Sequence, residues 1–140
     1  MNKTQKISLF LLRVGLGLFF FYAGFSKIID SSWSAAGYIS SAKHFVGFYG
    51  ALLSPSILPI VNFLNAWGLT LLGLSLLTGI FVRLSSILGI VLMALYYLAL
   101  PFPHPDAHSF IIDDHIILIL ALLVVINFGA GKIWSLTRRA

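Results

Sequence analysis

The chain lacks cysteine and glutamate, and charged residues make up only 9% of its 140 residues. Without cysteine it has no disulfide, no thiolate metal ligand and no attachment point for a c-type haem. Its charged fraction is far below the roughly 25% that is typical of soluble domains. Since 59% of the residues are hydrophobic and the mean hydropathy is +1.01, the composition predicts an integral membrane protein.

Acidic residues are also fewer than basic ones. Four aspartates stand against nine lysines and arginines, which gives a formal net charge of +5. Most of the basic residues lie just outside apolar runs, as in the flanks of membrane helices. We therefore interpret the basic balance as a signal of membrane orientation, and we expect no nucleic-acid partner.

Apolar segments of spanning length predict an all-α, four-helix transmembrane bundle that forms a single domain. Helices of this kind rise about 1.5 Å per residue and cross a hydrocarbon core of roughly 30 Å. Lys3 and Lys6 before the first run also fit a cleaved signal peptide, but Arg13 interrupts that run and no A-x-A site follows it. The predicted helices cover about residues 7–27, 57–81, 84–100 and 112–128.

The segment between the first two predicted helices, residues 28–56, is more polar but keeps many aromatic residues. Trp33, Tyr38 and Tyr49 lie among serines there, which is typical of an amphipathic segment. Aromatic side chains of membrane proteins gather at the level of the lipid headgroups. We expect an interfacial helix between loops, lying along the membrane surface.

The distribution of basic residues predicts the orientation of the bundle. An even number of spans places both termini on one side, and only Lys27 and Lys43 fall on the other side. The positive-inside rule then gives cytoplasmic termini, with the bilayer being a bacterial cytoplasmic (inner) membrane. The basic residues on the side of the termini are Lys3, Lys6, Arg83, Lys132, Arg138 and Arg139.

An Asp-Asp-His cluster, residues 113–115, opens the fourth predicted helix. Lys27, Asn65 and Tyr97 fall at the same outer depth on the other three helices. A polar side chain within the membrane normally faces the bundle interior, because exposing it to lipid costs free energy. We therefore predict a polar pocket between the helices that opens outward.

The members of the cluster have different expected roles. Asp113 is placed to cap the helix, which is a structural role. Asp114 is expected to lie deeper, where it either forms a structural ion pair with Lys27 or handles protons together with His115. Histidine side chains exchange protons near neutral pH, so Asp114 and His115 are the candidate catalytic residues.

Arg13 lies about two turns inside the first predicted helix, with no carboxylate at its depth. Two interpretations fit this position. The guanidinium either extends to the cytoplasmic headgroups or contacts an anion or a quinone oxygen.

Metal and haem ligands are sparse. His104 and His108 have a spacing that binds metal on a helix, but prolines lie beside His104 and no third ligand is fixed. A haem held by two histidines needs them on different helices, and only His115 is clearly helical. We expect neither a metal nor a haem.

Several segments resemble the DoxX/DoxD family of small four-helix bacterial membrane proteins. These are residues 12–27, with an arginine, glycines and a final Gly-Phe-Ser-Lys; the glycine-rich residues 67–84, which end in Arg-Leu; and residues 129–135, Gly-Ala-Gly-Lys-Ile-Trp-Ser. The cluster at 113–115 looks closest to the DoxD branch. Many members carry glutamate near the start of the second helix, where this chain has Asn65, so a role of that acid does not carry over.

The resemblance implies a membrane subunit of a quinone-linked oxidoreductase, similar to that of thiosulfate:quinone oxidoreductase, which works with a second protein subunit. Quinone is the expected cofactor, and Lys27, Asn65, Arg13, Tyr97 and Asp113 are the expected ligand-binding residues. The alternative is a non-enzymatic membrane anchor or scaffold for a redox or stress-response complex. Small-solute transport needs more than four helices unless the protein is a dimer, and a homo-oligomer is left open.

Overall fold

The computed structural model describes residues 1–101 and 110–136, and every regular element in these ranges is helical. The predicted all-α class is therefore confirmed for the described residues. In chain order the elements are α1 (Lys3–Ile29), α2 (Ala36–Ser40), α3 (Val46–Ala51), α4 (Leu58–Thr78), α5 (Val82–Ala99), α6 (Asp114–Asn127) and the 3-10 helix η1 (Ala130–Lys132).

Three helices, α1, α4 and α5, are long and apolar enough to span a membrane. α6 is also apolar but has 14 residues, which extend about 21 Å against a hydrocarbon core of roughly 30 Å. It is therefore shorter than the predicted helix over residues 112–128. The reason lies at its start, where Asp113 has an extended backbone and caps the helix with its side chain.

Capping groups also set the other helix ends, which hydropathy alone does not locate. α1 begins at Lys3, ahead of the predicted residue 7, because Asn2 and Gln5 form a reciprocal capping box. α4 ends at Thr78, before the predicted residue 81, because Gly79 takes a left-handed conformation with φ 81°. The short turn that follows leads directly into α5.

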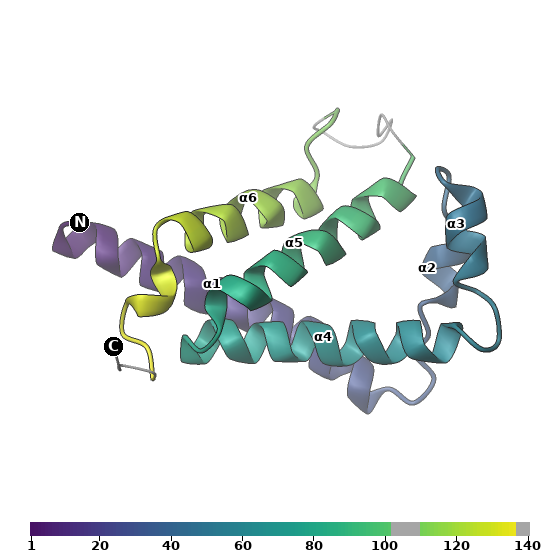
Figure 1. Ribbon diagram of the computed structural model, residues 1–140, viewed down its shortest axis with the longest axis horizontal. Coiled ribbons are helices and arrows are strands. Elements are labelled where there is room, and N and C mark those ends of the chain that lie inside the picture. The colour runs from purple at the N-terminus through teal and green to yellow at the C-terminus, as the bar shows by residue number, and fades with distance from the viewer. Residues whose placement is uncertain (102–109, 137–140) are drawn as a thin grey trace.

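The long helices alternate in direction, and Figure 1 shows α1 beside α4 and α5 beside α6. The start of α1 and η1 lie at one end of the bundle, whereas α2 and α3 lie at the other end. Side chains buried between the helices form the main core, among them Phe20, Leu76, Leu122 and Val125. The bundle thus has a terminal end and an end covered by α2 and α3.

Glycines let the backbones of α1 and α4 come into direct contact. A β-carbon on Gly73 would lie 2.3 Å from the backbone nitrogen of Phe21, and one on Gly24 would lie 2.3 Å from that of Thr70. Small residues at such crossings permit close van der Waals packing of membrane helices. α1 and α4 therefore form the most tightly joined pair of the bundle.

The expected interfacial segment folds as two short helices, α2 and α3, in place of one. They pack against the end of α5, where Tyr38 donates a hydrogen bond to the carbonyl of Tyr96 at 2.6 Å. The backbone amide of Lys43 donates to the carbonyl of Ala99 at 3.0 Å. These bonds satisfy carbonyl groups that the end of a helix leaves without partners. The segment thus caps α5; below, α2, α3 and their loops are called the cap.

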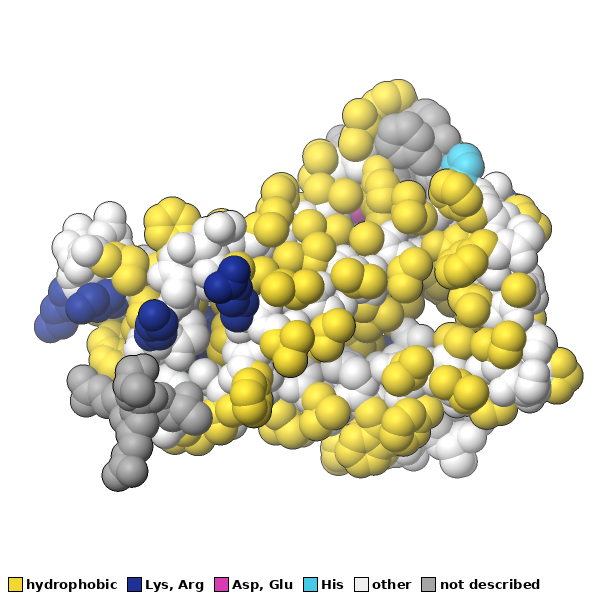
Figure 2. Space-filling view, in the orientation of Figure 1, with side chains coloured by type: hydrophobic (Ala, Val, Ile, Leu, Met, Phe, Trp, Pro, Cys, Tyr) yellow, Lys and Arg dark blue, Asp and Glu magenta, His cyan; other side chains and the backbone are white. Residues whose placement is uncertain are grey.

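The surface is largely apolar, as Figure 2 shows for one face, and basic side chains gather at the terminal end. Leu11, Leu18, Leu64 and Leu88 are each more than half exposed, at 58–61%. Exposed apolar residues distributed in this way along several helices suit contact with lipid. Together with the length of α1, α4 and α5, they make the chain a multi-pass membrane protein.

Arg13 is completely buried, which excludes an extended side chain at the headgroups. Its Nη1 donates to the carbonyls of Ala130 at 2.6 Å and Ile133 at 2.8 Å, and its Nη2 donates to that of Trp134 at 3.3 Å. The ring of Phe10 packs 5.3 Å from the guanidinium carbon. Arg13 therefore fastens the segment after α6 to α1.

Replacing Arg13 by methionine should lower the free energy of unfolding by about 2–4 kcal/mol, because the change leaves buried carbonyl groups without a donor. Reversible unfolding in detergent micelles measures the effect. Arg83→Met, at an exposed position near the start of α5, is the matched control and should change stability by less than about 0.5 kcal/mol. Equal stability of Arg13→Met and wild type would contradict the fastening role.

Gly73→Ala should destabilise the protein by about 1–3 kcal/mol, because the added methyl group forces α4 away from the backbone of α1. Gly68→Ala on the same helix is the matched control, because a β-carbon added at Gly68 would meet no neighbouring atom within 4 Å. Thermal unfolding in one detergent compares the two variants. If Gly73→Ala and Gly68→Ala unfolded at the same temperature, close contact between the backbones of α1 and α4 would not be required for stability.

Candidate functional site

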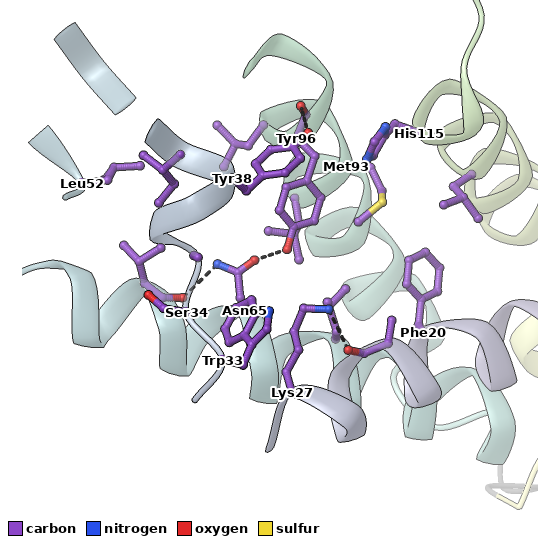
Figure 3. A pocket seen from close by; sticks show the side chains of 18 of the residues that line it. Phe20, Lys27, Trp33, Ser34, Tyr38, Leu52, Asn65, Met93, Tyr96 and His115 are labelled. Atoms are coloured by element: carbon purple, nitrogen blue, oxygen red, sulfur yellow. Dashed lines mark hydrogen bonds between the residues drawn. The ribbon is translucent and has the colours of Figure 1, made fainter. Parts of the chain in front are cut away.

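A cavity of about 400 Å³ lies between the bundle and the cap (Figure 3). All six α-helices contribute side chains to its wall. Four of the predicted site residues line it: Lys27, Asn65, Asp114 and His115. The rest of the wall is mainly apolar and aromatic, and includes Phe20, Trp33, Tyr38, Tyr49, Met93 and Tyr96.

His115 lies at the edge of the cavity and is held by Asp113. Its Nδ1 is 2.7 Å from Oδ2 of Asp113, whose Oδ1 accepts the backbone N–H of Ile116 at 3.0 Å. One carboxylate therefore caps α6 and orients the imidazole. Nε2 of His115 makes no hydrogen bond to a described residue, and it is the ring nitrogen available to a bound molecule.

Asp114 does not lie deeper than Asp113, so that expectation is wrong. The side chain of Asp114 is 80% exposed and that of Asp113 is 12% exposed. The cause is the position of Asp113 as the N-cap residue of α6. An N-cap residue with an extended backbone turns its side chain back over the helix end, whereas the side chain of the next residue points outward. Asp114 still lies 3.4 Å from Nδ1 of His115, at the mouth of the cavity.

Lys27 reaches the cavity from α1 and does not pair with Asp114. Its Nζ donates to the carbonyl of Ala23 at 2.8 Å and lies 5.3 Å from the centre of the Trp33 ring. Among the described residues, no carboxylate is within ion-pair distance of this ammonium group. The predicted structural pair is therefore absent from the part of the chain that the structure describes.

Asn65 and Tyr96 join the two sides of the cavity. Asn65 is 7% exposed, and its Oδ1 accepts a hydrogen bond from the hydroxyl of Tyr96. Its Nδ2 donates to the carbonyl of Val61 at 2.9 Å. The ring of Tyr96 lies 5.8 Å from that of His115, measured between centres. Tyr96 thus spans the distance between α4 and α6.

Tyr38 closes the cavity from the cap. Burial raises the pKa of its hydroxyl, and the neighbouring Tyr96, Tyr49, Asp113 and Asp114 raise it further. Tyr38 consequently stays neutral at physiological pH and keeps its bond to the carbonyl of Tyr96. It supplies an aromatic wall and no ionised group.

Tyr97 and Arg13 are not part of the cavity wall. The Tyr97 hydroxyl donates to the carbonyl of Ile111 at 2.8 Å and ties α5 to the segment before α6. Successive helical residues point about 100° apart, so Tyr96 takes the inner position and Tyr97 does not. The sequence did contain a signal for Tyr96: it lies three residues after Met93, and this spacing places both side chains on the helix face that lines the cavity.

The Asp-Asp-His cluster has the atoms to ligate a metal, since one ligand atom from each residue lies within 4.8 Å of the others. The two oxygens of Asp113 accept hydrogen bonds from the backbone of Ile116 and from His115. The described geometry is thus explained by helix capping and by the His115 contact. His104 and His108 lie outside the described residues.

Residues 8–101 match DoxX. The chain belongs to the DoxX family. The matched region extends from α1 to the end of α5, and so includes Lys27, Asn65 and Tyr96 but neither Asp113 nor His115. No curated protein and no solved structure matches the chain.

Asp113→Ala in this DoxX protein should lower the free energy of unfolding by about 0.5–2 kcal/mol, because it removes the N-cap of α6. It should also free His115, which is visible as a changed imidazole signal in nitrogen-15 NMR. Asp114→Ala is the neighbouring control, with an expected effect below about 0.5 kcal/mol. A larger loss of stability in Asp114→Ala than in Asp113→Ala would contradict the assignment of Asp113 as the N-cap residue of α6.

Proposed function

We propose that this DoxX protein is the quinone-binding membrane subunit of an oxidoreductase. The observation that supports this function best is the cavity itself, which surrounds a few polar groups with aromatic and apolar side chains. Ligand sites commonly have this composition and a volume of about 300–1,000 Å³. A quinone ring suits it because the ring is flat and apolar and carries two acceptor oxygens.

Quinone reduction takes up two electrons and two protons, so the site must handle protons close to the ring. In the proposal, His115 exchanges a proton with a quinone oxygen through Nε2, while Asp113 holds Nδ1. Asp114, exposed at the cavity mouth, passes protons between His115 and water. Lys27 and Asn65 orient the ring from the opposite wall. Arg13 and Tyr97 have no part in binding, because their contacts lie elsewhere.

The electrons come from a donor outside this chain, and we propose thiosulfate, oxidised by or with a partner subunit. The termini face the cytoplasm of a bacterium and the cavity faces the outer side of its inner membrane. This orientation is supported by the exposed basic residues at the terminal end, which include Lys3, Lys6, Arg83 and Lys132.

Membranes that contain the protein should form quinol from a water-soluble quinone when thiosulfate is added. His115→Ala should lower this rate by about 10²-fold or more, as loss of a general acid–base group does, and Asp114→Asn should lower it less. His44→Ala, a histidine outside the cavity wall, is the control and should keep the wild-type rate. Quinol absorbance measures the reaction at matched protein levels.

Two results would contradict the proposal. An unchanged rate of quinol formation in His115→Ala would mean that the reaction does not take place in this cavity. A wild-type protein without activity or quinone binding, with or without co-purifying partners, would favour the role of a membrane anchor for a redox or stress-response complex.

A further inference from the structure

Among the residues that the structure describes, Lys27 is the lysine or arginine that lines the cavity. Its positive charge is only partly compensated. One of its three N–H groups donates to Ala23, and the face of Trp33 lies beside it. A carbonyl oxygen and an aromatic face attract an ammonium group, but neither carries a full negative charge. Lys27 therefore has donor capacity left within a mainly apolar cavity.

The nearby described carboxylates are committed to other groups. Asp30 is close to Lys27 along the chain, but it accepts hydrogen bonds from the backbone and hydroxyl of Ser32 and is exposed. Asp113 binds His115 and caps α6, and Asp114 is exposed beside His115. Lys27 thus faces the cavity without an acidic partner among these groups.

The side-chain amide of Asn65 does not bind Lys27 either. Oδ1 of Asn65 accepts from Tyr96, and Nδ2 of Asn65 is a donor. A ligand that binds at Lys27 must therefore bring its own acceptor oxygen. Because an ammonium group in an apolar surrounding is stabilised most by a negative charge, an anionic oxygen satisfies this position better than a neutral one.

The surroundings of Lys27 also restrict the shape of the ligand. Figure 3 shows Trp33 next to Lys27, with Tyr38, Tyr96 and Phe20 around the same space. Aromatic walls of this kind pack against flat rings. We infer that Lys27 is an anion-binding pole of the cavity, which selects quinoid or aromatic acids over neutral rings of similar shape.

This inference rests on the proposed quinone site for the identity of the ring. Reduction of a bound quinone would place negative charge on its oxygens, and Lys27 and His115 are the wall residues that would hold such an oxygen and supply a proton to it. A ligand that is ionised before it binds tests the contact with Lys27 directly, because no quinone reduction is needed to create the negative charge.

Isothermal titration calorimetry of the protein in detergent tests the inference with two compounds of similar size. One is a hydroxynaphthoquinone, which is ionised at neutral pH, and the other is the neutral methylnaphthoquinone. We expect wild type to bind the hydroxy compound about tenfold more tightly. Lys27→Met should remove most of this preference, because it should weaken binding of the hydroxy compound much more than binding of the methyl compound, which loses only the orienting contact. Lys43→Met, an exposed lysine outside the cavity wall, should behave as wild type. Circular dichroism checks that the variants remain folded.

The outcomes separate the two proposals. Equal affinity for both quinones in wild type, or a preference that persists in Lys27→Met, overturns the anion-binding role and leaves the quinone site standing. Naphthoate, an aromatic acid that is not a quinone, is titrated as the third compound. If naphthoate binds in a manner that depends on Lys27 and neither quinone binds, the anion-binding role is supported and the quinone function is overturned. Absence of binding for all three compounds overturns both.

Discussion

The direct backbone contact between α1 and α4 is the constraint on which the cavity depends. Lipid is as apolar as the helices, so tight packing rather than the hydrophobic effect joins them. Gly24 and Gly73 permit that packing, and it fixes Lys27 and Asn65 on adjoining helices. Figure 1 shows α4 and α5 separating toward the end that α2 and α3 cover. The cavity is located there, where the cap and α6 complete the wall.

Several polar side chains in the bundle donate a hydrogen bond to a carbonyl group of their own helix. A bilayer core offers no water to a buried donor, so a carbonyl one turn earlier is the nearest acceptor. Because these bonds lie within single helices, they do not depend on a ligand, and the donors that remain are the groups able to recognise one. The pairs are Lys27 with Ala23, Asn65 with Val61 and Thr70 with Ala66.

The sequence predicted the helices and several residues of the cavity wall, because the position of a side chain along a helix follows from local pattern. Hydropathy located the apolar segments, and the depth of polar residues brought Lys27, Asn65 and His115 to one cavity. It did not predict the inversion of Asp113 and Asp114, because the direction of an N-cap side chain depends on one residue's backbone angles. Nor did it predict that residues 28–56 form a cap, which depends on tertiary hydrogen bonds to α5.

Arg13 and Lys27 show why two cations on the same helix have different roles. The partners of Arg13 are 117 to 121 residues away in the chain, and no local pattern announces them. Three backbone carbonyls converge on its guanidinium, whose planar fork suits several acceptors at once, so its charge is used within the protein. Lys27 finds one carbonyl and a ring at the edge of a cavity. The number of acceptors that the fold delivers, and not the charge or the depth of the residue, distinguishes a structural cation from one that remains able to bind a ligand.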